Sequence, residues 1–478
     1  MKRVKRLPPR QHKWLTAAAL AAGLLAGAGH AQAETYAVEL VAPQGKIGPL
    51  NNAGVMVGVN RTVGFCPNPY PSCYSIDTVV AWKPKTNRPV PLPAPAGLPD
   101  LAVSGINRAG WITGTASFGG VDFKPEPVVW RPNSAGYTVE QLGLLPGNNR
   151  ARVAGIDNFN RVVGYATSSS FPPVNAAPFM WTPTGGLTNL TTMGFPNDIP
   201  LSISGAGTVG LNQHWYKLDV PGTVTPNAPL PAGFTNAEAG GQINDAGDQA
   251  RFLITGGSQN VAYLFRYIAS TTLWQQLHPA GTGRLASYGT GSIDNRRNVT
   301  GTVLSTGVFA PGPTGFAQSL TDLLSPAYAG VSVVTGGTRN ANGMIAAKVG
   351  IGRSAGRVAR LVPIHPCTTS CARVAALVVK ARSVTSCDST NLVTARLIVR
   401  DENNTALPGI TVSGRFLDEY YLNKKVTGIT AGDGSVRFVH RGPACVGAVS
   451  FFVDNVTASG RSFDRFRGKL TDYAIPAP

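Results

Sequence analysis

Few side chains in this sequence combine the chemistry and the spacing of a catalytic site, and the most enzyme-like cluster is His214-Trp215-Tyr216. Histidine and tyrosine can transfer protons during the cleavage of a polysaccharide. Adjacent residues of a strand point to opposite faces, so His214 and Tyr216 would share one face and Trp215 would occupy the other. A strand that packs into a core explains the same three residues, and we therefore assign no catalytic residue.

Two aromatic residues, Tyr70 and Tyr74, lie on either side of Cys73 in a segment that reads as a loop. Their rings could stack on a sugar, because aromatic side chains present an apolar face and a polar tip. A covered loop without a ligand explains them equally well. The predicted binding residues are Tyr70, Tyr74, His214 and Tyr216.

Carboxylates beside asparagines could indicate calcium loops, and the candidates are Asp157, Asp245, Asp248 and Asp294. Their spacing lacks the alternating order of oxygen ligands that a calcium loop needs, so we interpret them as turn residues. The sequence also has no nucleophile elbow, no paired-histidine zinc helix and no phosphate-binding loop. We predict neither a metal nor another cofactor.

The sequence has six cysteines, all beyond residue 33. An even set in an oxidising compartment indicates three disulfides, although six cysteines allow 15 connectivities. The histidines are too scattered to complete zinc sites with these cysteines. Local spacing favours the pairs Cys66 with Cys73, Cys367 with Cys371, and Cys387 with Cys445.

The first 33 residues have the pattern of a secretory signal peptide. Six basic side chains precede or begin an apolar run that extends to about Gly29, and the segment closes on Ala31-Gln32-Ala33. Small residues at these positions favour cleavage before Glu34. The apolar run is shorter than the roughly 20 residues of a membrane span. We therefore expect an exported protein with no membrane span after cleavage, located outside the cell, at its surface or in the periplasm.

Removing this segment changes the charge balance. The formal net charge of +18 falls to +12, because the segment holds six basic side chains and no acidic one. The remaining surplus is spread over the chain without a basic stripe, which argues against specific nucleic-acid binding. We favour solubility as its role, with attraction to acidic polysaccharide, lipopolysaccharide or extracellular nucleic acid as the alternative. Only 14% of residues are charged, while 56 Gly and 37 Pro indicate many short strands joined by turns.

A short motif recurs between residues 34 and 366: an aliphatic residue, Asn or Asp, two further residues, then Gly or Asn, followed by a small apolar strand ending in Gly. Six copies are separated by 40 to 56 residues, and a seventh, Asn340-Ala341-Asn342-Gly343, is degenerate. Asn, Asp and Gly favour tight reversals. The six regular copies begin at Leu50, Ile106, Ile156, Ile203, Ile243 and Ile293.

Each period contains further strands, such as Val129-Trp130-Arg131-Pro132 and Tyr137-Thr138-Val139-Glu140-Gln141-Leu142. A fourth strand returns to the next turn, as in Arg152-Val153-Ala154-Gly155-Ile156. Four antiparallel strands in about 47 residues predict one propeller blade per repeat. The segment Tyr36-Ala37-Val38-Glu39-Leu40 can pair with the last repeat and remove a free sheet edge. We therefore predict a seven-bladed β-propeller over residues 34–366.

These repeats resemble the HAF repeats of exported bacterial proteins, in which an Asn-x-x-Gly turn and an aromatic-Pro strand recur in tandem. This chain departs from that family because it keeps an aromatic residue in the strand, as in Phe179-Met180-Trp181-Thr182-Pro183, without the family's preceding histidine. No role tied to that histidine can be transferred. The resemblance implies an extracellular or surface propeller without an established shared catalytic site.

Residues 367–478 follow a different pattern of short strand-like runs separated by turns. The runs are expected at 375–381, 393–400, 410–416, 436–440 and 448–453, which indicates a β-sandwich. Segments such as Pro408-Gly409-Ile410-Thr411-Val412-Ser413-Gly414 resemble the immunoglobulin-like domains appended to exported bacterial proteins. The complete expectation is an all-β chain, a seven-bladed propeller followed by an immunoglobulin-like β-sandwich.

The function expected from these features is non-enzymatic binding or surface interaction by an exported protein. The expected partner is an extracellular polysaccharide or another surface protein. One alternative is a polysaccharide lyase or glycosidase on a propeller scaffold, and a second is a structural component of an extracellular matrix or filament. A fold by itself does not identify a ligand, so the sequence leaves these classes open.

Overall fold

The computed structural model describes residues 34–63, 75–84, 88–118, 124–168, 176–211, 214–237, 241–255, 262–277, 291–303, 305–352, 354–382, 390–418, 422–443 and 448–475. The predicted signal peptide, residues 1–33, lies outside them. Strands dominate these segments, and helix is limited to two short 3₁₀ turns, η1 (Leu190–Met193) and η2 (Pro326–Tyr328). No helix in the described segments is long and apolar enough to cross a membrane. The predicted all-β fold class is confirmed.

In the described segments the strands form nine small sheets, seven before residue 365 and two after residue 370. The first sheet contains β2 (Gly45–Leu50), β3 (Met56–Val63), β4 (Ser75–Trp82) and β5 (Pro89–Pro91). The second contains β6 (Asp100–Ile106), β7 (Ile112–Ser117), β8 (Glu126–Asn133) and β9 (Gly136–Gln141). The third contains β10 (Arg150–Ile156), β11 (Val162–Thr167), β12 (Ala177–Thr182) and β13 (Gly186–Asn189).

The next three sheets continue along the chain in the same way. The fourth contains β14 (Ser202–Ile203), β15 (Thr208–Gly210), β16 (His214–Lys217) and β17 (Val224–Pro226). The fifth contains β18 (Phe234–Ala237), β19 (Gln242–Ile243), β20 (Gln249–Thr255), β21 (Ala262–Ile268) and β22 (Leu273–Gln276). The sixth contains β23 (Ser292–Ile293), β24 (Val299–Val303), β25 (Thr306–Ala310) and β26 (Gln318–Ser319).

The seventh sheet joins the two ends of this region. Its order is β1 (Thr35–Ala42), β29 (Ser354–Ile364), β28 (Ile345–Ile351) and β27 (Val331–Arg339). β1 runs antiparallel to β29, with Val38 opposite Leu361, so the first described strand completes the sheet formed by the last repeat. The predicted pairing of 36–40 with the last repeat is therefore present in the structure.

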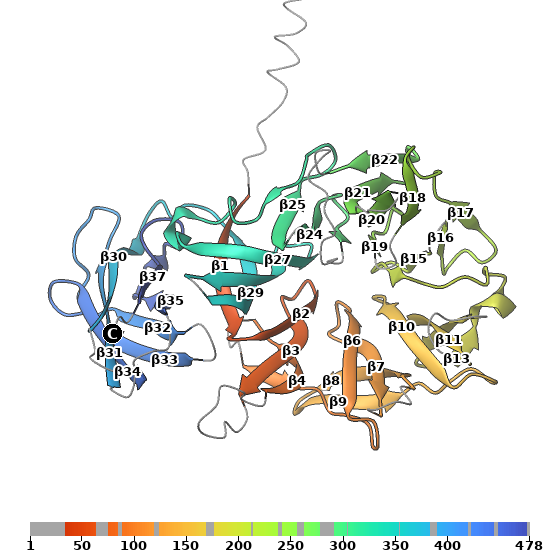
Figure 1. The fold of residues 1–478 in the computed structure, drawn as a ribbon, viewed down its shortest axis with the longest axis horizontal. Helices are drawn as coiled ribbons and strands as arrows, with labels where there is room; N and C mark the ends of the chain where they lie inside the picture. Colours follow the sequence, from red (N-terminus) through yellow and green to blue (C-terminus); the bar gives the residue numbers. More distant parts are fainter. Residues whose placement is uncertain are drawn as a thin grey trace, which may run out of the picture.

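Figure 1 shows these seven sheets following one another around a common centre in chain order. In each sheet, the strand that leads into the repeat motif ends on the first motif residue, and the next strand begins five or six residues later. The sequence pattern places the strand before each turn last in its period. In the structure this strand is the first of the next sheet, because the turn joins it to the strand with which it pairs. The arrangement is compatible with the predicted propeller.

Apolar side chains fill the space between neighbouring sheets. Met56 and Trp82 pack against Ala346 and Val358 of the seventh sheet, whereas Val57 packs toward the second sheet. Residues that are adjacent on a strand point to opposite faces, so one strand supplies core residues to both of its neighbours. The aromatic residue expected in each period is part of this core: Trp82 and Trp130 are fully buried, and Trp181 is 4% exposed.

The glycine expected at the end of the strand after each turn lies inside that strand in four copies, at Gly58, Gly114, Gly164 and Gly301, and ends it only at Gly210. Gly114 is the third residue of β7, and a Cβ atom there would lie 1.9 Å from the carbonyl oxygen of Ala102 on β6. A register shift between Val103 and Gly105 bends β6 toward this position. Gly114 therefore permits the close approach of two backbones at an irregularity of the sheet.

The two sheets after residue 370 share one apolar core. One contains β30 (Cys371–Ala381), β31 (Thr390–Arg400), β34 (Ser435–Pro443) and β36 (Ser462–Phe463). The other contains β32 (Thr411–Leu417), β33 (Asn423–Ile429), β35 (Val449–Thr457) and β37 (Thr471–Ala474). All five strands expected here are present, while β33, β36 and β37 were not expected. The rings of Phe416, Phe438 and Phe451 pack together between the sheets.

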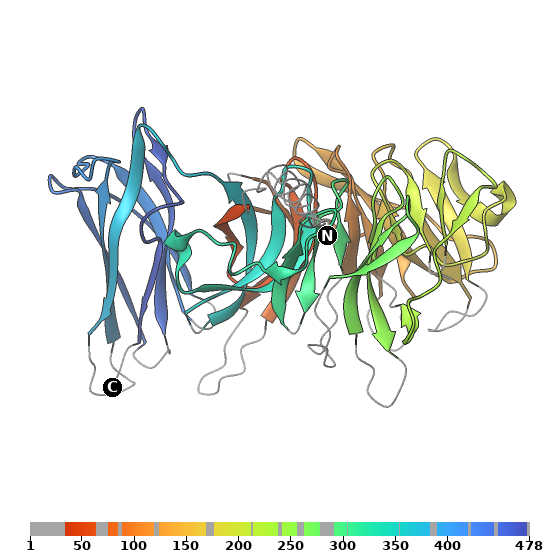
Figure 2. The ribbon, with the colours of Figure 1, turned by 90° about the horizontal axis from the view of Figure 1, so that it is seen from above.

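The C-terminal sheets pack directly beside the seventh sheet (Figure 2). The hydroxyl of Ser325 donates to the carbonyl oxygens of Arg465 and Phe466, each at 2.9 Å, and the backbone N–H of Leu470 donates to the carbonyl of Ala327 at 2.8 Å. The ring of Tyr328 contacts Phe452, with 6.0 Å between centroids. The turn around η2 therefore anchors the C-terminal sheets to the ring of seven. The predicted boundary at residue 366 lies between β29 and β30.

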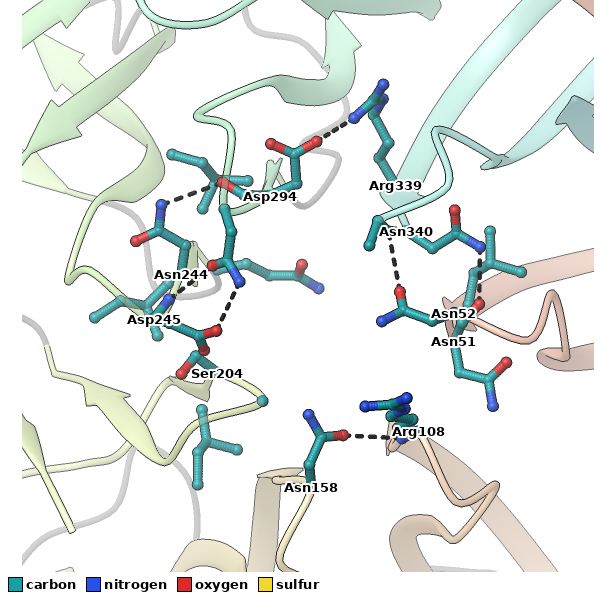
Figure 3. Close-up of a pocket in the computed structure, with 18 of the residues that line it drawn as sticks. Asn51, Asn52, Arg108, Asn158, Ser204, Asn244, Asp245, Asp294, Arg339 and Asn340 are labelled. Atoms are coloured by element: carbon teal, nitrogen blue, oxygen red, sulfur yellow. Dashed lines mark hydrogen bonds and ion pairs between the residues drawn. The ribbon is translucent and has the colours of Figure 1, made fainter. Parts of the chain in front are cut away.

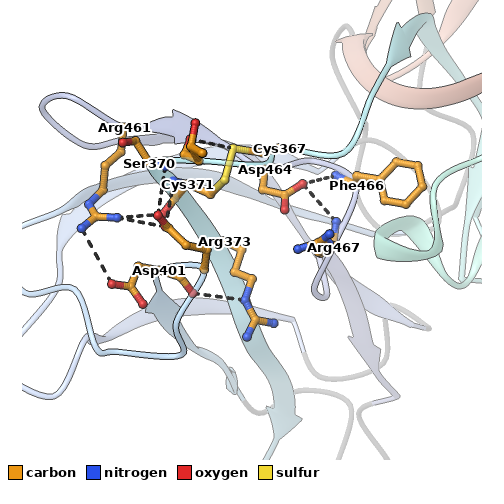
Figure 4. The surroundings of a disulfide bond; sticks show 11 residues. Cys367, Ser370, Cys371, Arg373, Asp401, Arg461, Asp464, Phe466 and Arg467 are labelled. Carbon is orange, nitrogen blue, oxygen red and sulfur yellow. Dashed lines mark hydrogen bonds and ion pairs between the residues drawn. A yellow bond between two sulfur atoms is a disulfide. The ribbon is translucent and has the colours of Figure 1, made fainter.

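A disulfide joins Cys367 and Cys371 where the chain leaves β29 and enters β30 (Figure 4). The carboxylate of Glu402 accepts backbone N–H groups of Ser370 and Cys371, each at 2.9 Å, and pairs with Arg461. This predicted disulfide is therefore present, in a segment held by local polar contacts. The other predicted pairs, Cys66–Cys73 and Cys387–Cys445, lie outside the described residues.

The pairing of β1 with β29 should contribute strongly to stability. Leu40 on β1 is 2% exposed and belongs to the core that joins the seventh sheet to the C-terminal sheets. We expect Leu40→Ala to lower the free energy of unfolding by about 2–5 kcal/mol, because it removes buried methyl groups from a packed site. Leu273→Ala, at a leucine that is 62% exposed, is the matched control and should change it by at most about 0.5 kcal/mol. Denaturant titration measures both, and equal effects would contradict the assignment.

The stability of the C-terminal sheets should fall on mild acidification. His440 is 8% exposed, lies against Phe416, and its Nδ1 has no hydrogen-bond partner among the described residues. Burial, with a smaller contribution from the charge of Lys424, lowers the pKa of His440 below its ordinary value. The unfolded chain therefore binds this proton more readily, so stability is lost as the pH falls through about 6.5.

His440→Gln should flatten this part of the pH profile of the unfolding midpoint between about pH 8 and pH 5. His365→Gln, at an exposed histidine, should leave the profile as it is. An unchanged profile in the His440 variant would exclude His440 as its cause.

Candidate binding site at the centre of the ring

The seven repeat turns share one local structure. In the first turn, the backbone N–H of Asn51 donates to the carbonyl of Val55 at 3.0 Å, and the side-chain Oδ1 of Asn51 accepts the N–H of Val55 at 2.9 Å. A side-chain oxygen that accepts a backbone N–H a few residues later is the reason that Asn and Asp favour turns. The residues in the same position of the other turns are Asn107, Asp157, Ser204, Asn244, Asp294 and Asn340.

The fifth motif position explains why the motif allows both Gly and Asn. Gly54 has φ +80° and Gly110 has φ +84°, in the left-handed region that glycine adopts without strain. Asn160 occupies the same position in the third turn with φ 64°, and asparagine is the residue that tolerates this region best after glycine. In the sixth turn Arg297 takes this conformation, with φ 66°.

Hydrogen bonds connect each turn to the next around the centre. Four of these bonds run from a side-chain amide to a carbonyl oxygen of the following turn: Asn51 to Asn107 (3.1 Å), Asn107 to Asp157 (3.0 Å), Asn244 to Asp294 (3.1 Å) and Asn340 to Asn51 (2.8 Å). The backbone N–H of Asn158 donates to Gly205, and the hydroxyl of Thr208 donates to Asp245. Arg339 bridges the sixth and seventh turns through Asp294. The bond from Asn340 to Asn51 closes the circle.

A second set of side chains, at the third motif position, points back to the preceding turn. The Oδ1 atoms of Asn52 and Asn158 accept the backbone N–H groups of Ala341 (2.9 Å) and Arg108 (3.0 Å). Asp245 accepts the N–H of Ala206 at 2.9 Å in the same way, and Asn295 accepts that of Asp245. Figure 3 shows several of these contacts, with the labelled side chains arranged around an open centre.

The centre of the ring holds an open pocket of about 300 Å³, lined by residues from all seven turns. Aliphatic side chains from the first motif position contribute part of the wall, as with Leu50, Ile106 and Ile203. Polar side chains from the third position contribute the rest, among them Asn52, Asn158, Asp245 and Asn295. The pocket also contains Arg108, Arg296 and Arg339. A concave site with a few convergent polar groups is where a small ligand or the end of a chain can bind.

Arg339 occupies the first motif position, where the other six turns have Leu or Ile. Its side chain is 1% exposed and pairs with Asp294, which is 7% exposed, and with Glu34 at 2.7 Å. Burial disfavours the charged guanidinium, but the charges of Tyr36, Glu34 and Asp294 outweigh this effect and raise the pKa of Arg339. The hydroxyl of Tyr36 donates to Glu34, and burial together with Glu34 raises the pKa of Tyr36. Arg339 thus ties the start of the described chain to the sixth and seventh turns.

Two of the residues that the sequence suggested as a site, His214 and Tyr216, lie on β16. Tyr216 on β16 is 1% exposed and packs against Phe195, with 4.5 Å between ring centroids, in the core between the third and fourth sheets. His214 is half-buried on the same strand and does not line the central pocket. Burial raises the pKa of Tyr216, which disfavours the ionised form. These contacts favour the packing interpretation of this strand. Tyr70 and Tyr74 lie outside the described residues.

The aspartates considered as calcium ligands accept hydrogen bonds from the protein. Asp157 accepts backbone N–H groups of Phe159 and Arg161, and Asp248 accepts from Asn244, Ala269 and Arg297. Among the described residues, no three His, Cys, Asp or Glu side chains are grouped as metal ligands. These hydrogen bonds support the interpretation of the aspartates as turn residues.

Sequence reasoning missed Arg108, Arg296 and Arg339, and it treated the third-position asparagines as local turn residues. The usable signal was the repeat itself, because equivalent positions of a closed ring must converge on its axis. Aligning the seven copies of the motif position by position would have placed these residues at one centre.

No protein-family model and no curated protein matches this sequence. Among solved structures, the chain is similar to a fungal alcohol oxidase in complex with copper, with 11% identity over 94% of this chain and 100% of that chain and a TM-score of 0.40. It is also similar to an ulvan lyase of a new polysaccharide lyase family, with 10% identity over 85% and 96% of the two chains and a TM-score of 0.31.

Prolyl oligopeptidase B from Galerina marginata is similar at 10% identity over 78% of this chain and 48% of its own, with a TM-score of 0.32. At these identities and TM-scores the similarities assign no activity to this chain.

Replacing Arg339 with the aliphatic residue of the other turns should destabilise the protein. Arg339→Leu leaves the buried carboxylate of Asp294 without its cation, so we expect a loss of about 3–5 kcal/mol in the free energy of unfolding. The control is Arg61→Leu, in an ion pair with Asp77 whose side chains are each 38% exposed, which should cost at most about 1 kcal/mol.

Adding Asp294→Asn to Arg339→Leu should recover part of the loss, because the uncompensated charge is then removed. Denaturant titration of the two single variants and the double variant measures this coupling. An Arg339→Leu protein as stable as the parent would contradict the role assigned to this residue.

Proposed function

We propose that this chain is an exported, non-enzymatic binding protein whose central pocket contacts an extracellular partner, with a polysaccharide as the expected partner and another surface protein as the alternative. In this proposal, residues 34–366 form a seven-bladed β-propeller of HAF-like repeats, and residues 367–478 form an immunoglobulin-like β-sandwich. The seven sheets, their shared centre and the pairing of β1 with β29 support the propeller. The Cys367–Cys371 disulfide is compatible with export.

The observation that carries the proposal is the pocket to which every repeat contributes. The amides of Asn52 and Asn158 in its lining are held by hydrogen bonds to neighbouring turns, so their positions are set before a partner arrives. Preorganised polar groups lower the entropic cost of binding, because fewer side chains must be ordered at the interface. This arrangement supports recognition of a ligand that enters along the axis of the ring.

The carboxylates of the pocket favour binding over catalysis. Asp294 pairs with Arg339 and accepts the backbone N–H groups of Arg296 and Asn298. Asp245 accepts hydrogen bonds at both of its oxygens, from Ala206 and from Asn295. A glycosidase needs one carboxyl group that donates a proton and a second that acts as nucleophile or base. Both carboxylates here are instead engaged in holding the turns.

The test is retention of the chain from Glu34 onward on an array of neutral and acidic polysaccharides, scored for binding and for cleavage. We expect retention without cleavage. Asn158→Ala, in the pocket, should weaken retention severalfold. The substitution removes the acceptor of the Arg108 backbone N–H and takes an amide out of the pocket lining. Asn133→Ala is the matched control, since Asn133 makes the same kind of bond to the N–H of Ala135 in the β8–β9 turn.

Two outcomes would favour the alternatives. Cleavage that is lost in His214→Ala would identify a polysaccharide-degrading enzyme. Self-association into filaments, without retention on any polysaccharide, would identify a structural matrix component.

A further inference from the structure

The unused hydrogen-bonding groups in the central pocket are mainly donors. The Oδ1 atoms of Asn52 and Asn158 accept backbone N–H groups of the preceding turns, which directs the Nδ2 end of each amide away from those bonds. Within the described part of the chain, neither Nδ2 group donates to another residue. Each amide therefore offers two N–H groups to a ligand.

Two guanidinium groups add charge to these donors. Arg108 and Arg296 are exposed residues of the second and sixth turns, and both line the pocket. Among the described residues, neither side chain forms an ion pair. Figure 3 shows Arg108 next to Asn158 at the edge of the central opening. A guanidinium group can bind a carboxylate through two parallel N–H bonds, which is the strongest polar contact available to such a site.

The carboxylate acceptors of the pocket are already engaged. Asp294 is neutralised by Arg339, and the oxygens of Asp245 accept from Ala206 and from Asn295, the latter at 2.6 Å. A ligand that offers N–H donors would compete with these contacts. A ligand that offers oxygen acceptors, and above all a carboxylate, would satisfy groups that are unpaired in the free protein.

We infer that the central pocket is a subsite for a carboxylate-bearing sugar, so that the polysaccharide of the proposed function is one that contains uronic acids. The inference rests on that proposed function. The pocket volume of about 300 Å³ is at the lower end of small-ligand sites, which suits one sugar unit or a chain end. Arg108 and Arg296 bind the carboxylate, Asn52 and Asn158 donate to hydroxyl oxygens, and the aliphatic wall contacts the C–H face of the ring.

A single-stranded nucleic acid would also offer acceptors, but its binding sites combine positive charge with aromatic platforms for the bases. The pocket lining contains no aromatic side chain among the described residues. Acidic saccharide is therefore the occupant that the lining favours.

The experiment compares polygalacturonate with its methyl-esterified form, because esterification removes the charge and keeps the sugar backbone. Dextran sulfate, dextran and single-stranded DNA complete the set of probes. Immobilised chains are titrated with the protein at low and at physiological salt. We expect polygalacturonate to bind at least tenfold more tightly than its ester, with an affinity that falls as salt rises.

The double variant Arg108→Gln/Arg296→Gln should reduce this affinity at least tenfold. The matched control is Arg88→Gln/Arg441→Gln, which removes the same charge at exposed positions outside the pocket and should change it less than twofold. Equal losses in the two double variants would overturn the subsite, because attraction would then follow net charge alone. Unfolding midpoints of both variants distinguish loss of binding from loss of folding.

Further outcomes distinguish the subsite from the proposed function. Retention on the esterified chain or dextran, equal to that on polygalacturonate, would overturn the acidic subsite and leave a polysaccharide-binding protein. Preference for dextran sulfate or DNA over polygalacturonate would overturn the carboxylate assignment. No retention on any carbohydrate would overturn both.

Discussion

The closed arrangement of the sheets depends on the contacts between the seventh turn and the first, which include a hydrogen bond from the Nδ2 of Asn340 to the carbonyl oxygen of Asn51, 289 residues away. Without these contacts, the turns would form an open series with unpaired polar groups at both ends. Buried amides and carbonyls that lack partners are costly, so closure satisfies groups that would otherwise oppose the fold. The pairing of β1 with β29 provides the same closure at the outer edge of the seventh sheet.

Closure of the ring also determines which faces of each sheet are buried. Each sheet has two buried faces because it has a neighbour on either side, and this explains why strands such as β3 carry core residues at consecutive positions. The seventh sheet has an additional neighbour, since the C-terminal sheets extend its core through Tyr328 and Phe452. The seam of the ring is therefore supported from outside by the C-terminal sheets and at its inner end by Arg339, which pairs with Asp294 and Glu34.

The candidate site arises from the same contacts that hold the ring. One end of the Asn52 or Asn158 amide binds the preceding turn, and its other end faces the pocket. Structural and ligand-binding roles thus share a side chain, which keeps the site rigid and couples its geometry to closure. The carboxylates of Asp245 and Asp294 already accept hydrogen bonds from the protein, whereas Arg108, Arg296 and these amides supply donors to the pocket.

Periodicity, turn residues and the aromatic residues of the strands were enough to indicate an all-β chain, its repeated four-stranded units, the pairing of residues 36–40 with the last repeat and the Cys367–Cys371 disulfide. These features depend on local backbone preferences and on spacing along the chain, which a sequence displays directly. The site could not be found in this way, because Arg108 and Arg296 are 188 positions apart and line one pocket only when the ring closes. Tyr216 had the same limit: whether a tyrosine faces a ligand or a neighbouring sheet depends on burial, and its ring is buried against Phe195.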